Sequence, residues 1–163
     1  MKTLSNYDNL IGQLDNFIRK YYKNKLLKGT LIAVSMIITA YTIVSFTEYY
    51  ARLSVDFRTA VFFTFISGLA GILFVYIFSP LLKLFKIGKT ISYKDASSII
   101  SDHFPEIQDK LLNTLELYRD NKQSPNLLIE AGINQKIESI KIFYFPKAIN
   151  YKENYKYLKL YLL

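Results

Sequence analysis

The fold is decided by residues 59–82, which read TAVFFTFISGLAGILFVYIFSPLL. This stretch carries no charged side chain and is rich in Phe, Leu, Ile and Val, each of which favours insertion into a bilayer. About 20 helical residues, at about 1.5 Å each, cross the ~30 Å hydrocarbon core of a membrane. The stretch therefore predicts a transmembrane helix over about 59–80, ending near Ser79-Pro80, because proline interrupts the helical hydrogen bonds.

A second apolar stretch, residues 29–47 (GTLIAVSMIITAYTIVSFT), predicts another span with more hydroxyl side chains. Only residues 48–58 separate the two, so we expect antiparallel spans joined in a hairpin. Small and hydroxyl side chains allow membrane helices to approach closely. The residues expected to pack the spans are Ser67, Gly68 and Gly71 in the second, and Ser35 and Thr39 in the first.

Basic residues flank the hairpin on the side away from the short loop, and the chain has a net charge of +8. By the positive-inside rule, both flanks stay in the cytoplasm and the loop faces out. We expect these residues to contact the anionic inner leaflet, which explains their charge without a nucleic-acid partner. They are Arg19, Lys20, Lys23, Lys25, Lys83, Lys86 and Lys89.

A soluble helical bundle is the alternative to this membrane hairpin. It would have to cover two wholly apolar helices on all sides, and a chain of 163 residues is too short to do so. We therefore predict an all-α membrane protein: a two-span transmembrane hairpin with an N-terminal amphipathic helix and a small cytoplasmic helical module.

The amphipathic helix is predicted over residues 5–25, within an N-terminal segment 1–28. Its apolar residues recur at three- and four-residue spacing, as on one face of a helix. The stripe is Leu10, Ile11, Leu14, Phe17 and Ile18. It could lie on the inner leaflet, pair with a partner helix, or pack on the helices after the second span. We prefer the packing interpretation.

The cytoplasmic module is predicted over residues 83–150, after the hairpin at 29–82. Three typical helix starts indicate three short helices: Ser92 followed by Asp95, then Pro105, then Ser124-Pro125. The middle helix carries an apolar stripe of Ile107, Leu111 and Leu115. The tail, residues 151–163, is Lys- and Tyr-rich and then apolar. We expect it to begin a third span in a longer protein, the alternative being a simple tail with one amphipathic turn.

Residues 103–117, HFPEIQDKLLNTLEL, follow the two spans and a Lys86, Ile91, Ser92 link. Together with the N-terminal YDNLIGQLDNFIRKYY segment, this sequence resembles the family known as domain of unknown function 4175. The resemblance implies a multi-span protein of the Gram-negative inner membrane, with two spans, a cytoplasmic helical insert, a third span and a periplasmic region. It implies architecture and localisation, with the N-terminus in the cytoplasm, and no catalytic residues.

Motifs for catalysis and cofactor binding are missing from the sequence. The chain has no Cys, and its single His, His103, has no partners at metal-ligand spacing. Its few glycines form no phosphate-binding loop. No charge lies inside either span to mark an ion path, although hydroxyls of the first span could line one. We expect no enzymatic activity, cofactor or metal, and the sequence identifies no small-molecule ligand.

Three functions remain open. The first is a noncatalytic anchor or scaffold of the cell envelope, a fragment of a larger protein, that binds protein partners or another copy through its helices. The second is a subunit of a transport or secretion assembly. The third is the anchor of an enzyme whose active site lies outside this segment.

Overall fold

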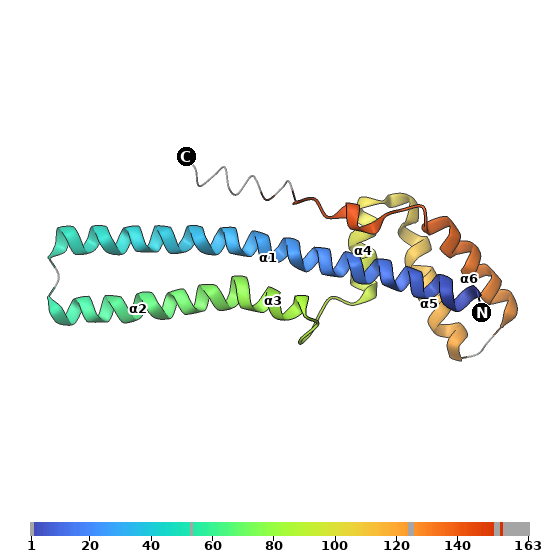
Figure 1. Cartoon of the computed structure of the whole chain (residues 1–163), viewed down its shortest axis with the longest axis horizontal. Helices are drawn as coiled ribbons and strands as arrows, with labels where there is room; N and C mark the ends of the chain where they lie inside the picture. Colours follow the sequence, from blue (N-terminus) through green and yellow to red (C-terminus); the bar gives the residue numbers. More distant parts are fainter. Residues whose placement is uncertain (1, 53, 124–125, 152–153, 155–163) are drawn as a thin grey trace. The chain divides into compact units, whose positions relative to one another are not determined.

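The computed structural model describes residues 2–52, 54–123, 126–151 and 154, and in these residues it holds helices and turns without a β-strand. The predicted all-α class is confirmed. The elements are α1 (Lys2–Ala51), α2 (Val55–Leu73), the π-helical η1 (Phe74–Phe78), α3 (Ser79–Leu84), α4 (Tyr93–His103), η2 (Pro105–Ile107), α5 (Gln108–Gln123), α6 (Leu127–Ile140) and η3 (Phe145–Ala148) (Figure 1).

The chain divides into two compact units. The first, which we call the module, combines residues up to 21 with residues 90–150. The second, which we call the hairpin, holds residues 22–89 and the described residues 151 and 154. Helix α1 contributes to both units without a break. The boundary predicted at residue 28 is therefore not a helix end, because a single glycine, Gly29, costs a helix only about 1 kcal/mol and does not stop it.

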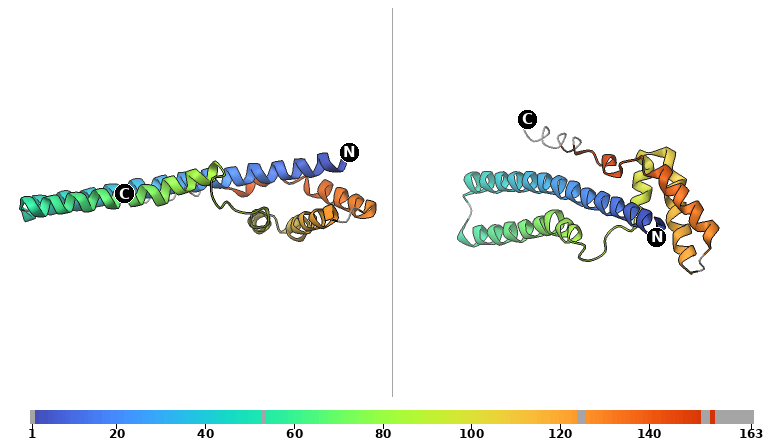
Figure 2. Two further views of the ribbon diagram at one scale, coloured as in Figure 1. Left: turned by 90° about the horizontal axis from the view of Figure 1, so that it is seen from below. Right: turned by 45° about the vertical axis from the view of Figure 1, so that its right-hand side comes forward.

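The hairpin pairs α1 with the continuous helical segment Val55–Leu84, and the two run side by side in Figure 1 and in the right-hand view of Figure 2. Two contacts fix the antiparallel register. Near the turn, Arg58 Nε lies 2.9 Å from Glu48 Oε1. At the other end, Gly29 packs directly against the backbone of Tyr76.

The second helix changes from α to π geometry over Phe74–Phe78, just before Pro80. Proline has no N–H to offer to the carbonyl four residues earlier, and its ring crowds that carbonyl. Here that carbonyl belongs to Tyr76, and the Ser79 N–H instead bonds the Phe74 carbonyl, five residues back. The Tyr76 carbonyl oxygen is the atom nearest to where a Gly29 side chain would begin. Pro80 and Gly29 therefore both affect the contact at the Tyr76 carbonyl oxygen.

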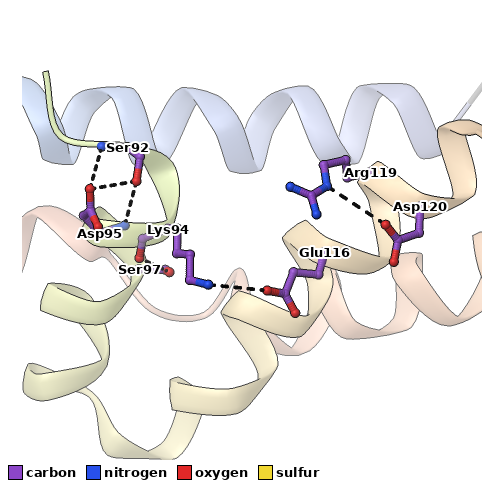
Figure 3. Close-up of polar contacts among 7 residues, drawn as sticks. All are labelled: Ser92, Lys94, Asp95, Ser97, Glu116, Arg119 and Asp120. Atoms are coloured by element: carbon purple, nitrogen blue, oxygen red, sulfur yellow. Dashed lines mark hydrogen bonds and ion pairs between the residues drawn. The ribbon is translucent and has the colours of Figure 1, made fainter. Parts of the chain in front are cut away.

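The module is built from α4, α5 and α6 around the N-terminal part of α1. Helix α4 begins with the predicted capping box: the Ser92 hydroxyl accepts from the Asp95 N–H, and the Asp95 carboxylate accepts from the Ser92 N–H (Figure 3). Helix α6 begins two residues later than the predicted Ser124-Pro125 start, capped by Asn126, whose side chain accepts from the Leu128 N–H at 2.9 Å. Ser124 and Pro125 lie outside the described residues.

After η3 the chain reaches the hairpin again. Asn154 is 5% exposed, and its amide donates to Asn24 Oδ1 at 2.6 Å. The third span predicted to begin in residues 151–163 otherwise lies outside the described residues.

Candidate functional site

The contact surface between the hairpin helices is a seam of alternating small and large residues. On α1 its least exposed members are Gly29 and Ala33, and Ala33 is completely buried. They are followed at helical spacing by Ile37, Ala40 and Val44, and α2 contributes Val61, Phe65, Leu69 and Ile72. A small residue facing a large one brings the two helices close without a void.

The predicted packing residues lie mostly off this seam. Ser67 and Gly71 are exposed, and no atom of the described chain lies within 4 Å of a Cβ added at Gly68 or Gly71. Gly68 borders an apolar recess between the helices, and Ser67 and Gly71 do not. On α1, Ser35 is buried and donates to the Leu31 carbonyl at 2.8 Å, whereas Thr39 is exposed.

The outer surface of the hairpin is apolar and uncovered. Every residue of α2 is described and none is buried, although the Val55–Leu84 segment contains an 18-residue window with a mean hydropathy of 2.3. Phe62, Phe63 and Phe74 are 57%, 63% and 60% exposed. On α1, Ile38 and Ile43 are also exposed. A soluble core helix would bury such residues, each of which gains about 1.5–3 kcal/mol when removed from water.

The basic residues of the hairpin gather at the end away from its turn. Lys23, Lys25 and Lys28 precede Gly29 on α1, and Lys83, Lys86 and Lys89 follow the Tyr76 contact. All are exposed except Lys83, which is partly buried. Of the two predicted basic residues in the module, Arg19 is exposed and Lys20 donates to the Pro146 carbonyl at 2.6 Å.

The two predicted interaction stripes are largely buried within the module. Leu14, Phe17 and Leu111 are completely buried, and Ile11 and Leu115 are partly exposed. Leu10, Ile18 and Ile107 are at most 6% exposed. These side chains already contact their own chain, which corresponds to the packing interpretation of the stripe and leaves partner binding to other surfaces.

Polar and aromatic contacts connect α1 to each helix of the module. The rings of Tyr7 and Tyr118 stack almost parallel, with centroids 3.4 Å apart. The Tyr93 hydroxyl donates to Asp15 Oδ1 at 3.1 Å. Asn6 donates to Asn134 of α6 at 3.4 Å. The N-terminal turns of α1 are therefore an integral part of the module core.

The surroundings of Tyr7 shift its pKa. Burial raises its pKa above the ordinary value, and the neighbouring Tyr118, Tyr93 and Asp8 raise it further. All these causes disfavour a negative charge on the Tyr7 hydroxyl. The stacked pair lies at a surface pocket between α1, α4 and α5.

The single histidine, His103, is the last residue of α4. It is exposed at the end of α4, where its ring meets Phe104 edge-on. Within the described ranges, no group of three His, Cys, Asp or Glu side chains is placed to hold a metal ion.

Sequence reasoning overlooked Gly29 and the Tyr7–Tyr118 pair. Gly29 has a sequence signal, because Gly29 and Ala33 show the same four-residue small spacing that drew attention to Ser67 and Gly71. The tyrosine pair joins residues 111 positions apart, so no local sequence pattern predicts it.

The chain matches no protein-family model, no curated protein and no solved structure.

Proposed function

We propose that this chain is a noncatalytic integral membrane anchor and scaffold component of a bacterial envelope, with its hairpin in the inner membrane. The observation that carries the proposal is that no residue of α2 is buried, although α2 is almost wholly apolar after Arg58. In water this surface would aggregate, whereas in a bilayer it meets hydrocarbon. The helices satisfy their own backbone hydrogen bonds, as lipid requires.

The charges support one orientation. The exposed lysines at the open end suit the anionic cytoplasmic leaflet, at about 1 kcal/mol each near its surface. The turn end carries Arg52 and Arg58 against Glu48 and Asp56, and is close to neutral. We therefore place the N-terminus and the module in the cytoplasm, and the turn on the outer side.

Cysteine labelling tests this topology cleanly, because the chain has no Cys of its own. Ser54→Cys marks the turn and Ser98→Cys marks an exposed position of α4. An impermeant maleimide should label Ser54→Cys in intact spheroplasts and Ser98→Cys only after lysis. Extraction of the chain by alkaline carbonate, or the reverse labelling pattern, would contradict the proposal.

The scaffold role predicts protein partners or self-association through surfaces outside the module core. Affinity capture of the intact chain from mild detergent, followed by size-exclusion chromatography with light scattering, tests this role. A specific, stoichiometric complex is expected. Recovery of a lone monomer from its native membrane would count against scaffolding, while leaving the membrane topology intact.

A second candidate, a subunit of a transport or secretion assembly, is favoured by the exposure of Ser67 and Gly71 on α2. Such small residues admit a neighbouring helix at close range. Gly71→Leu should then break the assembly without impairing insertion. Gly68→Leu is the matched control, because Gly68 borders the recess inside the hairpin instead. Equal assembly of wild type and Gly71→Leu would exclude this candidate.

A further inference from the structure

A pocket of about 650 Å³ opens on the module between the first turns of α1, the start of α4 and the middle of α5. This volume falls within the range of small-molecule sites. Its aliphatic lining consists of Ile11, Leu112 and Leu115, all partly buried. Anchoring and scaffolding do not require such a pocket, and every residue that lines it belongs to the module.

Three tyrosines line this pocket: Tyr7, Tyr93 and Tyr118. The Tyr7–Tyr118 stack fixes both rings, and each ring covers one face of the other. A ligand therefore meets an outer ring face, a ring edge or a hydroxyl. Aromatic faces and hydroxyl oxygens both attract cations.

The charges at the rim leave one carboxylate uncompensated. Lys94 Nζ lies 4.0 Å from Glu116 Oε1, and Arg119 Nε lies 4.0 Å from Asp120 Oδ1, so each rim cation has a carboxylate beside it (Figure 3). Asp8 also lines the pocket and is exposed, and it forms no ion pair with any residue that the structure describes. With Asp120 counted, three carboxylates face two cations at this rim, and the carboxylate without an ion pair among the described residues, Asp8, lies next to Tyr7 in the sequence.

The pKa of Tyr7 agrees with this charge distribution. Burial raises it first, followed by Tyr118, Tyr93 and Asp8, and of these causes the Asp8 carboxylate is the one that adds a negative potential at the Tyr7 ring near neutral pH. The negative potential of Asp8 favours a positively charged group.

We propose that this pocket binds an organic cation, an ammonium or guanidinium group on a hydrocarbon body. The cation lies between the Asp8 carboxylate and the tyrosine rings, where charge attraction and the cation–π interaction act together. The hydrocarbon body lies against Ile11 and Leu115. Because the whole site lies in the module, this binding does not depend on whether the hairpin crosses a membrane.

The test is isothermal titration calorimetry of the full chain in dodecyl maltoside micelles. The probe is benzyltrimethylammonium, compared with phenylacetate and benzyl alcohol, which carry the same ring with a negative charge or none. Blank titrations into micelles remove detergent partitioning. Only benzyltrimethylammonium should bind saturably. Nα-acetyl-lysine amide, which keeps its side-chain ammonium group, is titrated in parallel. Its binding distinguishes a basic side chain from a free ammonium compound as the source of the cation.

Variants locate the site. Asp8→Asn should weaken binding about five- to thirtyfold, the range that 1–2 kcal/mol covers. Asp102→Asn, an exposed carboxylate of α4 outside the pocket lining, should leave binding unchanged. Tyr93→Leu removes one ring without touching the Tyr7–Tyr118 stack and should also weaken binding. Circular dichroism confirms that each variant is folded.

Three results would overturn the proposal. One is tighter binding of phenylacetate than of benzyltrimethylammonium, since Lys94 and Arg119 would then define the site. Another is an equal effect of Asp8→Asn and Asp102→Asn. The last is no saturable heat from benzyltrimethylammonium with folded wild type.

Discussion

The close backbone approach between the hairpin helices, Gly29 against Tyr76, gives the sharpest prediction for stability. A Cβ at position 29 would overlap the Tyr76 carbonyl oxygen and lie 3.2 Å from its carbonyl carbon. Both atoms belong to backbone, so no side-chain rotation relieves the clash. Gly29→Ala therefore forces the helices apart, and overpacking of this kind costs about 1–3 kcal/mol.

The same substitution also has a favourable effect, because alanine stabilises a helix by about 0.5–1 kcal/mol relative to glycine. Gly68→Ala is the matched control: it gains the same propensity, and its Cβ meets no atom within 4 Å. The difference in unfolding free energy between the two variants isolates the contact. We expect Gly29→Ala to be less stable than Gly68→Ala by about 1–3 kcal/mol.

The assay is an SDS titration in mixed micelles, followed by energy transfer between dyes on Lys25→Cys and Lys89→Cys, in a chain that lacks other cysteines. Both positions are exposed at the open end of the hairpin. Pro80→Ala should partly rescue Gly29→Ala, because an N–H at position 80 gives the Tyr76 carbonyl an α-helical partner and draws it back into its own helix. Equal stability of Gly29→Ala and Gly68→Ala would refute the reasoning.

Three further predictions concern the module. Leu14→Ala should lower the unfolding free energy of the module by about 2–5 kcal/mol in urea titrations, because Leu14 is completely buried. The control is Asn16→Ala, on the exposed side of α1, and a loss no larger than that of the control would contradict the prediction. Ser92→Ala should cost about 1 kcal/mol by the same measurement, because the capping box of α4 is lost. The pKa of Tyr7 is raised in the folded module, so the folded module holds the hydroxyl proton of Tyr7 to a higher pH than the unfolded chain does. The contribution of the protonated Tyr7 to stability is therefore complete below about pH 10 and is lost as the pH rises through the folded pKa. Tyr7→Phe should make alkaline unfolding, followed by circular dichroism, less steep above that pH; an unchanged slope would show that Tyr7 does not contribute.

Local pattern was sufficient for much of the architecture. The helical class, the two apolar helices and the capping box at Ser92 follow from composition, helix period and cap chemistry, which act within a few residues of the chain. The same local reasoning divided α1 at residue 28, where the sequence changes from basic to apolar residues but contains no signal that ends a helix. It also placed the start of α6 too early, because Asn126 supplies an equally good cap two residues further on.

Contacts between distant residues were beyond such reasoning. The small residues of the second span suggested a packing face, yet Ser67 and Gly71 are exposed and the seam on α2 uses Val61, Phe65, Leu69 and Ile72. Periodicity shows which residues share one helix face, but it does not show which face meets the neighbour. That choice depends on the register and on the close approach that Gly29 allows.

The sequence by itself therefore determined that this chain forms two long apolar helices with basic flanks, because hydropathy and charge are properties of each residue. Only the tertiary structure decided that most of the N-terminal stripe is buried in the module, that Gly29 meets the Tyr76 carbonyl, and that three tyrosines and Asp8 line one pocket. Each of these depends on residues that are far apart in the chain, and their packing geometry exists only once the helices have come together.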